Sequence, residues 1–179
     1  ETLELDLKRR SAGELPRLSL EEAIDLLGTA ASALAVAHEE GVSHRDVKPS
    51  NLFLTPRRRG SILKLVDFGI AKVMDETALT ARTDGDRKFT ARYAAPEQFM
   101  PEYGATGPWT DVHALGLVLV EMATGRFALQ GETFVQIFAS CIDERSRPGL
   151  GARGLAAPPE IEAVVWRALS IRPADRFRD

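Results

Sequence analysis

His44-Arg45-Asp46-Val47-Lys48-Pro49-Ser50-Asn51 is a polar segment that lies between an apolar helical segment and the apolar run Leu52-Phe53-Leu54. Asp46 and Lys48 are two residues apart, so in extended backbone their side chains share a face. Asp46 can then accept a proton while Lys48 offsets charge beside it. Asn51 adds an amide oxygen, which suits a hard cation such as Mg²⁺. The segment therefore combines a possible proton acceptor, a positive charge and a possible metal ligand.

A second polar triplet, Asp67-Phe68-Gly69, follows the apolar run Ile62-Leu63-Lys64-Leu65-Val66. The apolar run is typical of a strand. A carboxylate at the end of a buried strand, next to a glycine that frees the backbone, is a second natural metal position.

Three motifs in this order, His44-Arg45-Asp46 with Asn51, Asp67-Phe68-Gly69 and Ala95-Pro96-Glu97, resemble the eukaryotic-type protein kinase family. One triplet alone is weak, but three at workable spacing are specific. The continuation Ile70-Ala71-Lys72 resembles bacterial members. The resemblance implies ATP and Mg²⁺ as cofactors and a protein partner that carries Ser or Thr.

The fold class expected from these patterns is mainly α with a small β component, and residues 1–179 read as one domain. Apolar residues at helical spacing predict helices over residues 1–10, 19–40, 108–124, 133–142 and 159–169. For the helix over 19–40, Ser19 and Glu22 predict a capping box, and Ile24, Leu27, Ala30, Ala31, Leu34 and Ala37 predict the packed face. By resemblance this is the large, C-terminal lobe of a kinase, with the catalytic loop at 44–51 and the activation segment at 67–97.

The small lobe of the family, with its Gly-rich phosphate loop and lysine, is expected to be absent from this chain and to be a missing partner of it. Residues 149–154 match G-x-G-x-x-G, but they follow no predicted strand and open no immediate helix. We therefore interpret them as a flexible loop, and we expect the chain to be inactive alone.

Composition excludes several function classes. The net charge of −3 gives no indication of a nucleic-acid partner or of an anionic membrane. Cys141 is the only cysteine, so no internal disulfide is possible and a reducing compartment fits. No apolar run approaches the ~20 residues that span a bilayer, so no membrane contact is expected from this segment. We expect a cytoplasmic kinase domain, whose full-length protein could be anchored elsewhere.

The resemblance assigns roles to the residues of both metal-binding motifs. Asp46 is implied as the catalytic base, and Lys48 as the lysine that stabilises the transferring phosphoryl group and indicates Ser/Thr specificity. Asn51 and Asp67 are implied as the Mg²⁺ ligands. Phe53 is implied as the apolar floor under adenine, and Thr90 as a residue of the substrate groove that contacts Asp46.

Other residues are implied to be structural. His44 and Phe68 resemble members of the internal apolar stack of the family, Asp111 the buried acid that binds the catalytic-loop backbone, and Glu97 with Arg176 a long-range ion pair. Since an isolated buried charge is costly, Asp111 should be hydrogen-bonded. His38 and His113 read as helix-packing residues.

Regulation is implied by Arg45 and Lys72, which resemble the basic residues that bind a phosphate on the activation loop. Thr77, Thr80 and Thr83 are candidate phosphorylation sites. Our hypothesis is that Asp86 partly substitutes for such a phosphate on Arg45, and the alternative is that this segment is a solvated polar loop. Phe89 departs from the family, which usually has Gly before the residue equivalent to Thr90.

Three functions stay open at this point. The first is a Ser/Thr protein kinase that transfers the γ-phosphate of ATP to protein hydroxyls. The second is a pseudokinase or interaction module. The third is a kinase-like small-molecule phosphotransferase, which would lack the segment that ends in Ala95-Pro96-Glu97.

Overall fold

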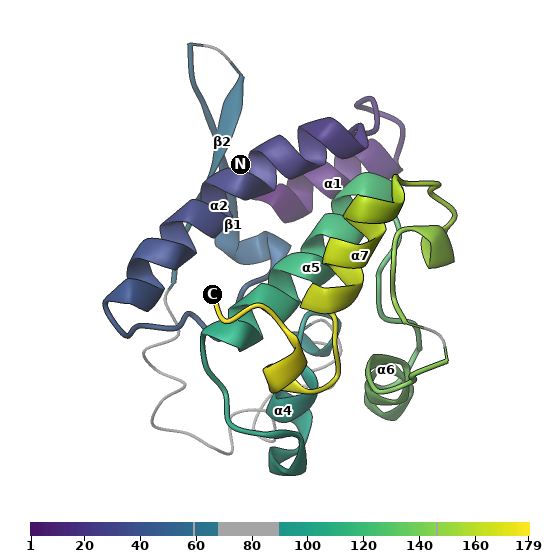
Figure 1. Cartoon of the computed structure of the whole chain (residues 1–179). Coiled ribbons are helices and arrows are strands. Elements are labelled where there is room, and N and C mark those ends of the chain that lie inside the picture. The colour runs from purple at the N-terminus through teal and green to yellow at the C-terminus, as the bar shows by residue number, and fades with distance from the viewer. Residues whose placement is uncertain (59, 68–89, 146) are drawn as a thin grey trace.

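The computed structural model describes residues 1–58, 60–67, 90–145 and 147–179. This part of the chain is mainly helical and contains a two-stranded sheet, as the sequence predicts (Figure 1). The elements are α1 (Leu3–Ser11), α2 (Leu20–Glu39), η1 (Pro49–Asn51), β1 (Leu52–Pro56), β2 (Ser61–Leu65), α4 (Pro96–Phe99), η3 (Pro101–Tyr103), α5 (Pro108–Thr124), α6 (Phe134–Cys141), η4 (Gly151–Arg153), α7 (Pro159–Ala168) and η5 (Pro173–Asp175).

Helix α2 begins with the predicted capping box. The Ser19 hydroxyl accepts a hydrogen bond from the Glu22 amide at 3.1 Å, and the Glu22 carboxylate accepts one from the Ser19 amide at 2.8 Å. The backbone hydrogen bond at Ser19 is also the main reason that the pKa of Glu22 is lowered. Gly41, at φ +74°, lies just beyond the helix and takes a left-handed conformation that glycine adopts without strain.

The packed face of α2 is shifted by one residue from the predicted one at its start. Ala23, Leu27, Ala30 and Leu34 are buried, whereas Ile24 is 36% exposed. Ile24 was therefore wrongly predicted as a core residue. A helix turns by 100° per residue, so the side chain after a centrally buried one already lies at the edge of the packed stripe.

Strands β1 and β2 form an antiparallel hairpin with Leu52 opposite Leu65 and Pro56 opposite Ser61. Helix α2 holds this hairpin through Thr29, whose hydroxyl accepts from the Leu63 amide at 2.9 Å and donates to the Leu26 carbonyl at 2.7 Å. Residues 44–51 lie in the connection from α2 to β1, so both ends of this polar segment are fixed by packed elements.

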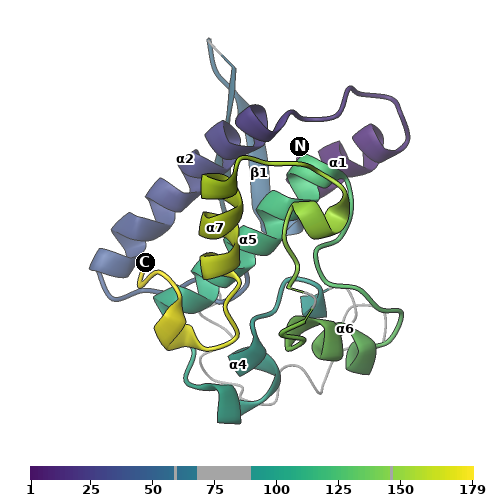
Figure 2. The same ribbon diagram turned by 45° about the vertical axis from the view of Figure 1, so that its right-hand side comes forward.

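Helix α5 is buried on nearly all sides and packs against α2 and α7 (Figures 1 and 2). Its Gly116 allows α7 to approach closely, because a Cβ atom there would lie 2.9 Å from Cδ2 of Leu169. On α7 itself, Val165 and Ala168 are buried, whereas Val164 is 53% exposed.

The loop over residues 149–154 contains the short helix η4 and binds a carboxylate of its own chain. Glu162 accepts hydrogen bonds from the Leu150 amide at 3.2 Å and from the Gly151 amide at 3.4 Å. A Cβ atom on Gly149 would meet the same carboxylate oxygen. The glycines therefore serve this internal contact. Within the described residues, none of the helices has the length and apolar character needed to cross a bilayer.

Candidate active site

Asp46, Lys48 and Asn51 lie together in the loop between α2 and β1. The Lys48 Nζ atom is 3.1 Å from Oδ2 of Asp46, and the two side chains are only 13% and 14% exposed. The Asn51 amide nitrogen donates to the Asp46 carbonyl at 2.8 Å, and it lies 3.4 Å from Oδ2 of Asp46. A candidate base, Asp46, and the Lys48 ammonium group thus lie side by side, and Asn51 holds the backbone carbonyl of Asp46.

Asp111 of α5 fixes the start of this loop from below. Its carboxylate is 0% exposed and accepts from the His44 amide at 2.7 Å and from the Arg45 amide at 2.6 Å. It also contacts Nε2 of His38 at 2.9 Å, so His38 does more than pack between helices. Hydrogen bonds from backbone amides to a carboxylate are stronger than neutral ones, so this residue is a firm anchor.

Two non-glycine residues flank the site in the left-handed conformation, Arg45 at φ +60° and Asp67 at φ +58°. Such conformations cost about 1–3 kcal/mol each and persist where surrounding contacts over-determine them. At Arg45 those contacts are visible on both sides, since Asp111 binds its amide and Gln98 donates to its carbonyl at 2.9 Å.

Asp67 directly follows a residue that is bound to the loop. The Val66 amide donates to the Asn51 carbonyl at 3.0 Å, and the Val66 carbonyl contacts Nε2 of His44 at 2.9 Å. This backbone contact brings the chain at Asp67 beside Asn51, and the Asp67 side chain is exposed. His44 itself is fully buried.

The donor chemistry of Asn51 and Asp67 fits a hard divalent cation. The Asn51 amide nitrogen is committed to Asp46, which leaves the amide oxygen as its ligating atom. Asp67 contributes an exposed carboxylate. Among the described residues, no group of three or more His, Cys, Asp or Glu side chains could hold a metal. A cation here would take the rest of its shell from water or from a bound phosphate.

Phe53 and Thr90 are the remaining described residues to which the sequence assigned a ligand or substrate role. Phe53 lies on β1 and is 38% exposed. Thr90 is buried and begins the turn that leads to Ala95-Pro96-Glu97. The other residues to which we gave roles in this segment lie outside the described residues: Phe68, Lys72, Thr77, Thr80, Thr83, Asp86 and Phe89.

Glu97 and Arg176 form a bidentate ion pair with both side chains fully buried. The Arg176 guanidinium donates to the two Glu97 oxygens at 2.7 and 2.9 Å. Its other hydrogen bonds go to the carbonyls of Ser170, Trp109 and Ile171, and the Thr110 hydroxyl donates to Glu97 at 2.8 Å. The pair therefore ties α4, α5 and the C-terminal segment together.

His113, on α5, is a buried packing residue. Burial, and next to it the positive charge of Arg176, lower the pKa of His113 well below its ordinary value. Cys141 is equally buried, and its pKa is raised to about 12, mainly by burial, so it stays a thiol. Both side chains are neutral, as the core around the ion pair requires.

Two further contacts escaped the sequence reading. Gln98 donates to the Arg45 carbonyl in the loop that precedes β1, and Tyr93 donates to the Glu121 carboxylate at 2.6 Å. Burial raises the pKa of Glu121 to about 7, while the hydrogen bond from Tyr93 opposes the shift. The available signals were Gln98 directly after Ala95-Pro96-Glu97, and an acidic residue within the otherwise apolar run 114–123.

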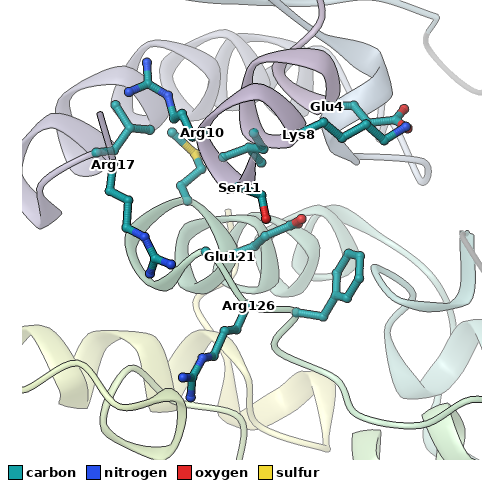
Figure 3. A pocket seen from close by; sticks show the side chains of 12 residues that line it. Glu4, Lys8, Arg10, Ser11, Arg17, Glu121 and Arg126 are labelled. Carbon is teal, nitrogen blue, oxygen red and sulfur yellow. The ribbon is translucent and has the colours of Figure 1, made fainter. Parts of the chain in front are cut away.

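A cavity of about 190 Å³ lies between α1 and α5, away from Asp46 (Figure 3). Figure 3 shows Glu121 of α5 pointing toward Ser11 of α1, with Arg17 and Arg126 on the other side of Glu121. The cavity gives Glu121 a partial route to water. It does not include any residue to which the sequence assigned a site role.

The chain is similar in sequence to known protein kinases. A family model described as protein kinase domain matches residues 4–163. The serine/threonine-protein kinase PknA of Mycobacterium tuberculosis (strain H37Rv) is 35% identical over 162 residues, which cover 90% of this chain and 35% of PknA. The serine/threonine-protein kinase PknB of Mycolicibacterium smegmatis is 33% identical over 156 residues, which cover 87% of this chain and 24% of PknB.

A solved structure shows the same arrangement of elements. The Mycobacterium tuberculosis PknI kinase domain superimposes with a TM-score of 0.65 and 25% identity, covering 98% of this chain and 56% of that domain. The chain spans about a third or less of these curated relatives and about half of the solved kinase domain.

Proposed function

Because the chain belongs to the protein kinase domain family, we propose that it forms the large lobe of a Ser/Thr protein kinase that transfers the γ-phosphate of ATP to protein hydroxyls. The observation that carries the proposal is the Asp46–Lys48 pair at 3.1 Å, supported from below by Asn51 and anchored by Asp111. In the proposed domain division, residues 44–51 are the catalytic loop and residues 67–97 the activation segment.

In the proposed reaction, one proton and one phosphoryl group are transferred. Asp46 accepts the proton of the substrate Ser or Thr hydroxyl while that oxygen bonds to the γ-phosphorus and the bond from phosphorus to the β–γ bridging oxygen breaks, releasing ADP. Lys48, next to Asp46, offsets the negative charge that develops on the transferring oxygens. Phe53 packs under the adenine, and Thr90 borders the groove for the protein substrate.

Asn51 and Asp67 are the residues that would hold Mg²⁺, through the amide oxygen and the exposed carboxylate. The bound ion would neutralise and orient the phosphate oxygens of ATP. The left-handed backbone at Asp67 supports this role, because strained residues gather where a side chain must be aimed at a ligand.

Residues 1–179 are expected to transfer little phosphate by themselves. Catalysis of this type depends on positioning, and a phosphate loop and its lysine are needed above the nucleotide. The glycine-containing loop at 149–154 cannot serve, since the amides of Leu150 and Gly151 bind the Glu162 carboxylate. We propose that the small lobe is supplied from outside these residues.

Regulation by phosphate is proposed for Arg45 together with Lys72. Within the described part of the chain, the Nε atom of Arg45 is buried and has no hydrogen-bond partner. A buried guanidinium nitrogen without an acceptor favours the binding of an anion brought by the activation segment. Phosphorylated Thr80 or Thr83, or the carboxylate of Asp86, is the proposed source of that anion.

A phosphoryl-transfer assay tests the proposal. The full-length polypeptide is incubated with γ-labelled ATP, Mg²⁺ and a generic protein substrate, followed by phosphoamino-acid analysis. We expect labelled phosphoserine or phosphothreonine that disappears when EDTA removes the metal. Labelling of aminoglycosides but not of protein would support the small-molecule phosphotransferase, and no labelling of either would support the pseudokinase.

ATP as donor agrees with a cytoplasmic location.

A further inference from the structure

Arg45, immediately before Asp46, is held at its backbone amide and at its backbone carbonyl by two different helices. Its amide donates to Asp111 of α5 at 2.6 Å, and its carbonyl accepts from the Gln98 side chain of α4 at 2.9 Å. Since Arg45 adopts φ +60°, these two contacts oppose its relaxation to the ordinary negative range. The carbonyl that Gln98 holds belongs to the peptide bond that leads into Asp46.

The orientation of the Gln98 amide is determined by its two partners. Its oxygen accepts from the Ala95 amide at 3.0 Å, and its nitrogen donates to the Arg45 carbonyl. A flipped amide would set its nitrogen against the Ala95 amide and its oxygen against the Arg45 carbonyl, and both contacts would be lost. The two partners therefore require one donor and one acceptor in this side chain.

Gln98 is also attached to a rigid base. It lies in α4 directly after Glu97, whose buried ion pair with Arg176 fixes this short helix to α5 and the C-terminal segment. The chain from Thr90 through Ala95 leads into the same helix. Gln98 thus connects the end of the proposed activation segment with the backbone next to the proposed base.

We propose that Gln98 is a positioning residue for Asp46, acting through the Arg45 carbonyl, so that the setting of the catalytic base depends on the docking of α4. The proposal rests on the proposed function, since Asp46 needs positioning only if it acts on a substrate. The nitrogen of Gln98 carries the effect on Asp46, and its oxygen only caps α4.

Two variants separate these halves of the side chain. Gln98→Glu keeps the acceptor for Ala95 but replaces the donor with an oxygen that repels the Arg45 carbonyl. Gln98→Lys keeps a donor for Arg45 and loses the acceptor. Gln136→Glu is the matched control, because Gln136 occupies the equivalent position of α6, and its side-chain oxygen accepts from the amides of Glu132 and Thr133 without contact to the catalytic loop.

We expect Gln98→Glu to lower kcat by about tenfold or more with KM for ATP within about threefold, since small displacements of a catalytic group cost rate more than binding. Gln98→Lys should keep at least about a third of the wild-type kcat, and Gln136→Glu should match the wild type within about twofold. A larger loss in Gln98→Lys than in Gln98→Glu, or equal losses in both, would show that Gln98 only caps α4 and would overturn the proposal.

Amide hydrogen exchange of the same three variants provides a readout that does not depend on activity. We expect faster exchange in peptides that cover residues 44–54 for Gln98→Glu, and no change there for Gln136→Glu. If the wild type transfers no phosphate, the proposed function fails, whereas unchanged exchange at 44–54 in Gln98→Glu would refute the contact between α4 and the loop.

Discussion

Replacing Asp111 with Asn should release the proposed catalytic loop while it leaves the shape of the side chain nearly unchanged. In the wild type, one carboxylate oxygen accepts from the Arg45 amide at 2.6 Å, and the other accepts from the His44 amide at 2.7 Å. An Asn side chain retains one oxygen, so one of these amides must face an NH₂ group.

The magnitude follows from that loss. A hydrogen bond to a buried charged group contributes about 1.5–3 kcal/mol, and a buried donor left without an acceptor costs about 1–3 kcal/mol. Part of this loss in stability is offset, because a neutral Asn side chain costs less to bury than the charged carboxylate. We therefore expect Asp111→Asn to lower the free energy of unfolding by about 2–4 kcal/mol and, through displacement of Asp46, to lower kcat about 10²-fold.

Urea denaturation of residues 1–179 and the phosphoryl-transfer assay on the full-length polypeptide measure the two effects. Asp143→Asn is the control, because Asp143 also accepts a backbone hydrogen bond, from the Arg145 amide at 2.9 Å, but does so in an exposed turn. This control should change stability by less than about 0.5 kcal/mol. An Asp111→Asn variant that loses less than about 1 kcal/mol and keeps full activity would refute the anchoring role.

Three further predictions concern stability, measured by urea denaturation. Glu97→Gln should cost about 3–5 kcal/mol, because it leaves the fully buried Arg176 guanidinium without its counter-charge; a cost below about 1 kcal/mol would contradict this reading of the pair. Glu121→Gln should stabilise the chain increasingly as the pH rises from about 4.5 through 7, by up to about 3 kcal/mol, because burial raises the wild-type pKa to about 7 and its ionisation in the folded state is unfavourable; a pH-independent difference would contradict it. Gly116→Ala should lower the free energy of unfolding by about 1–3 kcal/mol, since the added Cβ would lie 2.9 Å from Leu169. A more stable variant would contradict this prediction and would mean that the higher helix propensity of alanine outweighs the close contact.

The sequence was most informative where local patterns determine structure. The capping box of Ser19 and Glu22 was readable because its two hydrogen bonds involve residues three apart. The bounds of α5 followed from Pro108 at its start and Gly125 at its end. The family was recognisable from three motifs, and the family match over residues 4–163 confirms it.

The sequence was less informative about which side chains meet across the fold. Ile24 and Val164 have the right spacing for a core helix face, but the faces of α2 and α7 that contact α5 leave them at the edge. Gln98 could be noticed only as a polar residue beside a motif. Its partner, the Arg45 carbonyl, is a backbone atom 53 residues away and has no sequence signature.

His38 shows the same limit. At helical spacing a lone histidine is typical of packing, and the sequence does not indicate which carboxylate, if any, it contacts. Its partner Asp111 is 73 residues away, brought beside it by the crossing of α2 and α5.

The central proposal is that Asp46 accepts the hydroxyl proton during phosphoryl transfer, and one measurement tests it most directly. Initial rates of γ-phosphate transfer from Mg-ATP to protein are compared for the wild-type full-length polypeptide, Asp46→Asn and the exposed-surface control Asp25→Asn. The proposal predicts a fall of about 10²–10⁴-fold for Asp46→Asn with the fold intact, and wild-type rates for Asp25→Asn. Retention of a tenth or more of the wild-type rate by Asp46→Asn would contradict it.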